Sequence, residues 1–235
     1  MRWLRAPALV LAAIASPPAT VAAAPASTAS SPAPAASDAP PANLLSGTPA
    51  QGAAIDPVFA HLQLQRLRCG FREDKHIALL ARPLQSTGVI YFDRDRGIVR
   101  TTRTPHVEKV VLTRTALRIQ KGDHTEDIPL DKSKDLQAFA LVFPTLLRGD
   151  RAGIERSFEI ALYGRADGWW ALAFTPRSES LRALVRRVVV FGRAGELVGL
   201  QVAEASGDTT DTRLTDLQKN GDVPDAEIAA AFGAP

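Results

Sequence analysis

The sequence feature that most constrains the fold is a run of alternating apolar and polar side chains within residues 71–105. Alternation from Phe71 onward predicts a first strand, and Pro83 ends this run because proline has no N–H to donate to a strand ladder. Two more strands are predicted at 89–92 and 98–104, on either side of a charged turn. Three successive strands with short connections predict an antiparallel meander.

The rest of the chain continues this pattern. Short apolar stretches between turn residues predict further strands at 107–113, 116–120, 126–130, 157–164, 169–174, 182–191, 196–204 and 209–217. Helices are predicted at about 57–67 and at 133–147, where apolar residues recur every three or four positions. Pro144 is expected to kink or split the second helix. Residues 181–190 also fit a helix by periodicity, whereas three consecutive valines favour a strand.

The N-terminal part of the chain has the composition of an export signal followed by a linker. Residues 1–24 contain Arg2 and Arg5, then an apolar stretch and small residues, which together predict a cleavable signal peptide. Residues 25–52 are mostly Ala, Pro, Ser and Thr and bury too little apolar surface to fold, so a disordered linker is expected. One folded domain is then expected at 53–235, with ordered structure from about residue 55.

Charge and motifs exclude several classes of function. Once the two arginines of the signal peptide are set aside, 26 basic side chains balance 25 acidic ones, so a nucleic-acid-binding footprint is absent. The four histidines are scattered, and Cys69 is the only cysteine and is expected to be buried, so neither a zinc site nor a disulfide is predicted. The sequence contains no nucleophile elbow, P-loop or dinucleotide motif. We therefore expect a non-enzymatic protein with no metal or other cofactor.

Several short motifs occur in a characteristic order. They are F-x-E-x-K at 71–75, R-P-L-x-S-x-G at 82–88, W-x-L-x-x-x-P at 170–176 and E-x-x-G-D-x-T at 204–210. In order and spacing they resemble the LolA-like periplasmic outer-membrane lipoprotein carriers, and most closely a divergent LolA-related branch. The resemblance implies an α+β, mainly antiparallel fold: a curved incomplete barrel of about 10–11 strands, covered by a few helices that act as a lid.

The resemblance also implies a cellular location and a set of partners. Such carriers are periplasmic proteins that hold the acyl chains of a lipoprotein in a hydrophobic cavity between the inner and outer membranes. It implies an inner-membrane export complex and an outer-membrane receptor as partners, and a monomeric carrier. The related branch includes members associated with glycolipid or pigment assembly, so the cargo could be a lipoprotein or another lipidated envelope molecule.

One residue corresponds to the family's lid latch. Arg94 follows the second of the three meander strands, where the family has an arginine that donates hydrogen bonds to the lid backbone when the cavity is empty. Here Asp95 replaces the family's proline and Ile98 its later aromatic residue. Alternatively, Asp93 and Asp95 hold Arg94 in a solvated ion pair worth under ~1 kcal/mol.

Apolar residues of the sheet and of the 133–147 helix are candidates for the cavity wall. They are Phe71, Ile90, Phe92, Ile98, Phe139, Phe143, Leu147, Trp170, Leu172 and Phe174. Ordinary core packing is the default explanation for each of them. Because Tyr91 and Phe92 are both aromatic, the sequence leaves open which of the two faces inward.

Three functions remain compatible with the sequence. The first is a carrier for lipoproteins or for other acylated envelope molecules, including glycolipids or aryl pigments. The second is an exported interaction scaffold with a filled core. The third, an envelope hydrolase, is disfavoured by the missing catalytic motifs.

Overall fold

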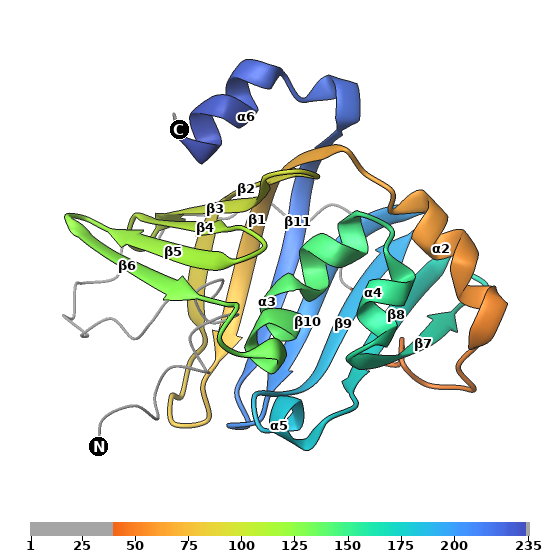
Figure 1. The fold of residues 1–235 in the computed structure, drawn as a ribbon. Helices are drawn as coiled ribbons and strands as arrows, with labels where there is room; N and C mark the ends of the chain where they lie inside the picture. The colour runs from red at the N-terminus through yellow and green to blue at the C-terminus, as the bar shows by residue number, and fades with distance from the viewer. Residues whose placement is uncertain (1–39, 234–235) are drawn as a thin grey trace, which may run out of the picture.

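In the computed structural model, which describes residues 40–233, eleven antiparallel strands form one curved sheet (Figure 1). The predicted signal peptide at 1–24 lies outside the described residues. The strands are β1 (Arg66–His76), β2 (Leu84–Asp93), β3 (Gly97–Thr104), β4 (Glu108–Leu112), β5 (Ala116–Lys121), β6 (His124–Pro129), β7 (Phe158–Gly164), β8 (Trp169–Pro176), β9 (Val185–Arg193), β10 (Glu196–Glu204) and β11 (Thr209–Lys219). The expected fold class, a mainly antiparallel α+β half-barrel, is confirmed.

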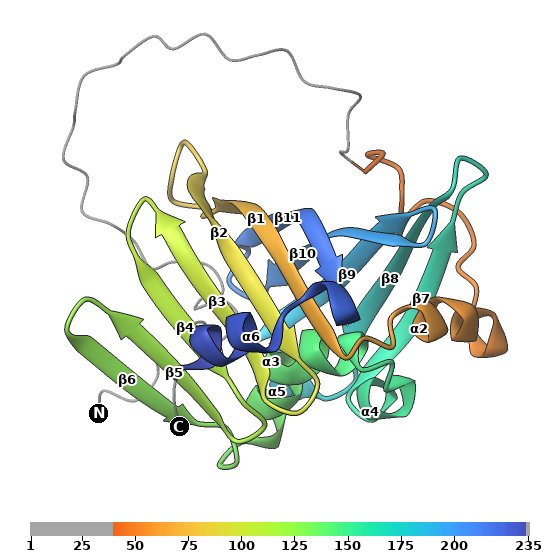
Figure 2. The same ribbon diagram turned by 90° about the horizontal axis from the view of Figure 1, so that it is seen from above.

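The order of the strands explains why helices cross the concave face. The sheet order is β6-β5-β4-β3-β2-β1-β11-β10-β9-β8-β7, so β6 and β7 lie at opposite edges (Figure 2). The chain must cross the sheet between them, and this connection contains α3 (Lys134–Leu147) and α4 (Arg151–Glu155). In Figure 1, α3 lies in front of the central strands.

The remaining helices are short and flank the sheet. They are η1 (Gly52–Ile55), α2 (Asp56–His61), α5 (Glu179–Arg182), η2 (Asn220–Asp222) and α6 (Asp225–Phe232). Helix α6 packs near β2 and near the start of β1 rather than beside α3 (Figure 1). Within residues 40–233, no helix has the length and apolar character needed to cross a membrane.

Two apolar clusters hold the sheet and the helices together. The larger cluster joins the concave face to α2 and α3 and includes Phe59, Leu67 and Phe139. The smaller one lies on the opposite face of β8 and β9 and includes Trp169 and Phe191. Because burial of apolar area is the main driving force for folding, the larger cluster fixes α3 against the sheet.

Packed structure begins earlier than expected. Leu44 lies within the predicted 25–52 linker, yet it is buried in the smaller cluster. The backbone of Ala50 also exchanges hydrogen bonds with Leu162 of β7, at 2.8 and 2.9 Å. An isolated apolar residue in an Ala/Pro-rich stretch can therefore dock on a preformed sheet, which composition alone does not reveal.

Several predicted boundaries were wrong for tertiary reasons. The helix predicted at 57–67 ends at His61, because the Leu64 N–H donates to the Leu147 carbonyl and the Gln65 N–H to the Asn220 side chain. The first meander strand consequently begins at Arg66, and it ends at His76, well before Pro83. The second begins at Leu84 instead of Val89.

Two helical expectations also changed. Helix α3 is not split at Pro144, because the loss of one backbone hydrogen bond is compatible with a helix that is packed into the core. The strand predicted at 182–191 is divided between α5 and β9, which begins at Val185. The strand prediction is confirmed apart from its start, and the alternative helix is present only at residues 181–182.

Candidate functional site

The predicted cavity residues converge on one surface, the concave face of the sheet opposite α3. All ten belong to the larger apolar cluster or pack against it. Nine are at most 7% exposed, and Trp170 is half-buried. In this structure the concave face is therefore closed by side chains from the sheet and α3.

Strand register decides which meander residues face inward. Phe92 pairs with Leu67 of β1 and with Ile98 of β3, and all three are buried in the larger cluster. Because successive side chains of a strand point to opposite faces, Tyr91 lies on the other face, where it is half-buried. The sequence left open which of Tyr91 and Phe92 faces inward, and the structure shows that it is Phe92.

A pocket opens beside α3 and reaches the concave core. It has a volume of about 400 Å³ and lies between α3, α4 and the start of β7. Val142, Ile154 and Phe158 line it and also belong to the larger cluster. Charged residues such as Lys134 and Arg156 also line the pocket, so the edge of α3 offers a mixed polar and apolar surface next to the core.

Arg94 lies in the turn between β2 and β3 and reaches the C-terminal end of α3. Its Nη2 donates to the carbonyl of Arg148 at 3.1 Å, and its Nη1 donates to the carbonyl of Leu64 at 3.2 Å. Arg148 is the residue that follows α3, so the guanidinium joins the sheet to the helix and to the segment before β1. The Arg148 carbonyl is one of the backbone oxygens left without an intrahelical partner where α3 ends, and the Leu64 carbonyl lies in the segment between α2 and β1.

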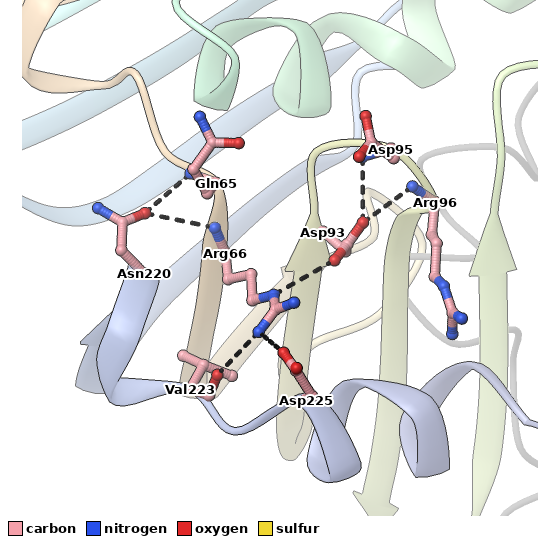
Figure 3. A network of polar contacts seen from close by, with 8 residues as sticks. All are labelled: Gln65, Arg66, Asp93, Asp95, Arg96, Asn220, Val223 and Asp225. Carbon is pink, nitrogen blue, oxygen red and sulfur yellow. Dashed lines mark hydrogen bonds and ion pairs between the residues drawn. The ribbon is translucent and has the colours of Figure 1, made fainter.

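The alternative considered for Arg94, an ion pair with Asp93 and Asp95, does not form within residues 40–233. Asp93 instead accepts hydrogen bonds from the backbone N–H groups of Asp95, at 3.0 Å, and Arg96, at 3.1 Å. It also pairs with Arg66 Nε at 3.5 Å. Figure 3 shows this network, which fixes the turn that carries Arg94.

The same network ties the turn to the C-terminal segment. The Asn220 side-chain oxygen accepts from the backbone N–H groups of Gln65, at 2.8 Å, and Arg66, at 3.4 Å (Figure 3). The Arg66 guanidinium also contacts the Val223 carbonyl and the Asp225 carboxylate. The position of Arg94 thus depends on residues far apart in the sequence.

A second hydrogen bond between Arg148 and Arg94 runs in the opposite direction. Its Nε donates to the Arg94 carbonyl at 3.0 Å. Burial and the nearby charges of Arg114 and Arg94 lower the pKa of Arg148. Each guanidinium thus donates to the backbone carbonyl of the other arginine, while the repulsion between their like charges opposes the contact.

A polar cluster on the concave face was missed by the sequence reasoning. Glu73 accepts hydrogen bonds from Arg100 Nη2 at 2.9 Å, Thr212 at 3.0 Å and Ser86 at 3.3 Å, and all four residues are buried. Burial raises the pKa of the Glu73 carboxyl and lowers that of Arg100, while their attraction opposes both shifts. The signal was present in the alternation, because Glu73 is two residues from Phe71 and shares its face.

A second buried ion pair lies close to the first along β1. Lys75 Nζ is 3.1 Å from Glu204 Oε1, and both side chains are less than 10% exposed. A buried charge needs such a partner, because the desolvation penalty is otherwise large. One end of the concave face is therefore polar, and the end near Arg94 is apolar.

Residues 40–233 contain His, Cys, Asp and Glu side chains, which are the residue types that most often bind metal ions. No group of three or more His, Cys, Asp or Glu side chains in this range is placed to hold a metal ion. Cys69 is buried in the larger cluster, where burial raises the pKa of its thiol to about 12. Its environment suits a small apolar residue and not a nucleophile.

Fold and site together define a class of protein: a half-barrel whose apolar concave face is covered by a helix. A family model described as outer membrane lipoprotein carrier protein LolA-like matches residues 48–232. The match spans most of the sequence, so the chain belongs to the LolA-like outer membrane lipoprotein carrier family. The suspected resemblance is confirmed. No curated protein sequence matches the chain.

Solved structures with similar folds are distant. A LolA superfamily protein from Nitrosomonas europaea is 11% identical, with 72% of this chain and 94% of that chain covered and a TM-score of 0.39. A DUF1329 family protein from Desulfovibrio piger is 11% identical, with 77% and 96% covered and a TM-score of 0.42. The Pseudomonas aeruginosa MucA/MucB complex gives 13% identity, 75% and 60% coverage and a TM-score of 0.43. At these TM-scores the similarities carry no argument about function.

Proposed function

We propose that this protein is a periplasmic carrier that holds the acyl chains of lipoproteins, or of another acylated envelope molecule, against the concave face of its sheet. The carrier would take its cargo from an inner-membrane export complex and deliver it to an outer-membrane receptor, as a monomer and without catalysis. Family membership supports the general role. The observation that carries the proposal is the continuous apolar surface shared by the sheet and α3.

The energetics favour binding if α3 can move. Each methylene taken out of water contributes ~0.8 kcal/mol, so part of one acyl chain is enough for useful affinity. The closed core must first give up its own packing, which lowers the net affinity and permits release. A carrier of this kind needs open and closed states that are close in free energy.

Arg94 is proposed as the latch of the closed state. Its two side-chain hydrogen bonds go to backbone carbonyls at 3.1 and 3.2 Å, and one of these belongs to Arg148 at the end of α3. Apolar packing of α3 also holds the lid, so the Arg94 hydrogen bonds are one part of what stabilises the closed state, and their loss should shift the balance toward the open state.

The filled concave face also supports a second candidate, an exported interaction scaffold. Nine of the ten predicted cavity residues are at most 7% exposed, as a module with a permanently closed core requires. The two candidates differ in one measurable property. A carrier takes up hydrocarbon, and a scaffold binds its protein partner without it.

Titration of the purified protein with the fluorescent hydrocarbon diphenylhexatriene separates the two. The carrier proposal predicts saturable binding that is competed by acylated molecules. Absence of saturable binding at micromolar protein, together with retention of a protein partner in the absence of lipid, would favour the scaffold. Mass spectrometry of molecules that copurify from native envelope would then identify the cargo class.

A further inference from the structure

The polar cluster on the concave face contains hydrogen-bonding groups that the protein does not use. Arg100, Thr102 and Glu108 are at most 2% exposed. Arg100 Nε and Nη1, Thr102 Oγ1 and Glu108 Oε1 have no hydrogen-bond partner anywhere in residues 40–233. Arg100 thus keeps three of its five N–H donors unpaired, since only Nη2 contacts Glu73 and Ser86.

Such groups are rare inside folded proteins. Buried polar atoms are nearly always hydrogen-bonded, because leaving one unpaired costs the free energy of its desolvation. Here three neighbouring residues on one face share this property. Thr102 pairs directly with Glu108 across β3 and β4, and Arg100 precedes them on the same face of β3.

The unpaired groups adjoin the apolar wall. The Arg100 guanidinium lies over the Phe71 ring, with Cζ 4.2 Å from the ring centroid. Val110, which pairs with Arg100 across β3 and β4, belongs to the larger apolar cluster. A chain lying along the apolar wall would therefore end beside these donors and acceptors.

The local charges are already balanced. Arg100 pairs with Glu73 at 2.9 Å, and Glu108 Oε2 pairs with Lys121 at 3.2 Å. A further anion would face two carboxylates, while a cation would face Arg100. An uncharged group that offers oxygen acceptors satisfies the free N–H donors without disturbing this balance.

We propose that Arg100, Thr102 and Glu108 form a polar subsite on the concave face that binds the uncharged oxygen groups, ester or amide carbonyls or hydroxyls, at the head of an acylated cargo. This inference rests on the carrier function proposed above, because these atoms are sealed in the closed state. It adds a preference among cargoes: acylated molecules with a neutral ester or amide head bind better than bare hydrocarbon and better than free fatty acid.

Thr102→Val tests the subsite with little risk to folding. The substitution keeps the shape of the side chain and removes a buried hydroxyl that has no protein partner, so the thermal midpoint should not fall. Thr101→Val, on the opposite face of the same strand, is the matched control. Affinities for methyl palmitate and palmitate are measured by displacement of diphenylhexatriene, which carries no oxygen.

The subsite predicts that Thr102→Val weakens methyl palmitate about three- to tenfold and leaves diphenylhexatriene binding within about twofold, whereas Thr101→Val changes neither. Equal methyl palmitate affinity in the wild type and Thr102→Val, with diphenylhexatriene still bound, would overturn the subsite and spare the carrier function. Palmitate binding about tenfold tighter than its methyl ester would overturn the preference for an uncharged head. If the wild type binds none of these probes, the carrier function fails, and the subsite with it.

Discussion

Arg94 and Arg148 each donate a hydrogen bond to the backbone carbonyl of the other, and this exchange joins the β2–β3 turn to the end of α3. The family resemblance places a latch at Arg94, but the sequence could not decide between a latch and an ion pair. The decision depends on Asp93, which is occupied by the N–H groups of its own turn. The backbone N–H groups of the turn compete with Arg94 for the Asp93 carboxylate, and the sequence alone does not show which donor binds it.

Arg94→Leu should weaken the closed state. The substitution leaves the Leu64 and Arg148 carbonyls without their charged donor, so we expect the free energy of unfolding to fall by about 1–3 kcal/mol in urea denaturation. Hydrocarbon should bind more tightly, because less free energy is spent on opening α3. Arg103→Leu, at an exposed arginine of β3 whose side chain makes no hydrogen bond or ion pair within residues 40–233, is the control and should change neither property appreciably. Equal effects of the two substitutions would remove Arg94 from its proposed role.

Cys69 should report on the closure of the concave core. With a thiol pKa of about 12, only about one molecule in ten thousand carries the reactive thiolate at pH 8. We expect iodoacetamide to leave the folded protein unmodified at that pH over a period in which the urea-unfolded protein reacts fully. Comparable rates for the folded and unfolded protein, followed by mass spectrometry, would mean that the concave face is open to solvent.

Among the helices and strands, the sequence predicted those that a local hydrophobic pattern determines. The alternation in residues 71–105 and the turn residues after it located all eleven strands, and helical periodicity located α3. The extent of α2 was not predictable, because Leu64 and Gln65 leave the helix to bond with α3 and η2. Helix α6 was not anticipated at all, although Asp225 and Phe232 dock it on arginines of β1 and the β2–β3 turn.

The start of α3 offers a test of the lid as a separate element. The Ser133 side chain accepts a hydrogen bond from the Leu136 N–H at 3.2 Å and caps the helix. Ser133→Ala should lower the free energy of unfolding by about 1 kcal/mol, measured by urea denaturation, because the cap is lost. Lys132→Ala, at the exposed preceding residue, should have no such effect. An unchanged stability of Ser133→Ala would show that the cap contributes nothing to holding α3.

The sequence predicted the apolar part of the candidate site but not its polar part, and strand geometry explains the difference. Large apolar residues pointed to the wall of the concave face, since they are few and recur at fixed parity. Its polar end was missed because Glu73 and Arg100 resemble ordinary surface charges until register brings them onto one face. Register is set by the pairing of strands that are distant in the sequence, so it cannot be inferred from one strand alone.

For the whole molecule, the strand topology makes the pairing of the sheet independent of the helix that covers it. The eleven strands form a continuous ladder, and α3 belongs to the connection between the two edge strands β6 and β7. Displacement of α3 therefore breaks no strand pairing. Under the carrier proposal, a hydrocarbon would enter between α3 and the sheet while the sheet stays intact.

Photo-crosslinking with an acyl chain that carries a diazirine group tests the central claim most directly, because it reports where the chain lies. If acyl chains bind between the sheet and α3, mass spectrometry should find the crosslinks on concave residues, above all Phe92, Phe139 and Leu172. An excess of unlabelled methyl palmitate should suppress them. Crosslinks confined to exposed apolar residues such as Leu79 and Val107, unaffected by competitor, would contradict the account.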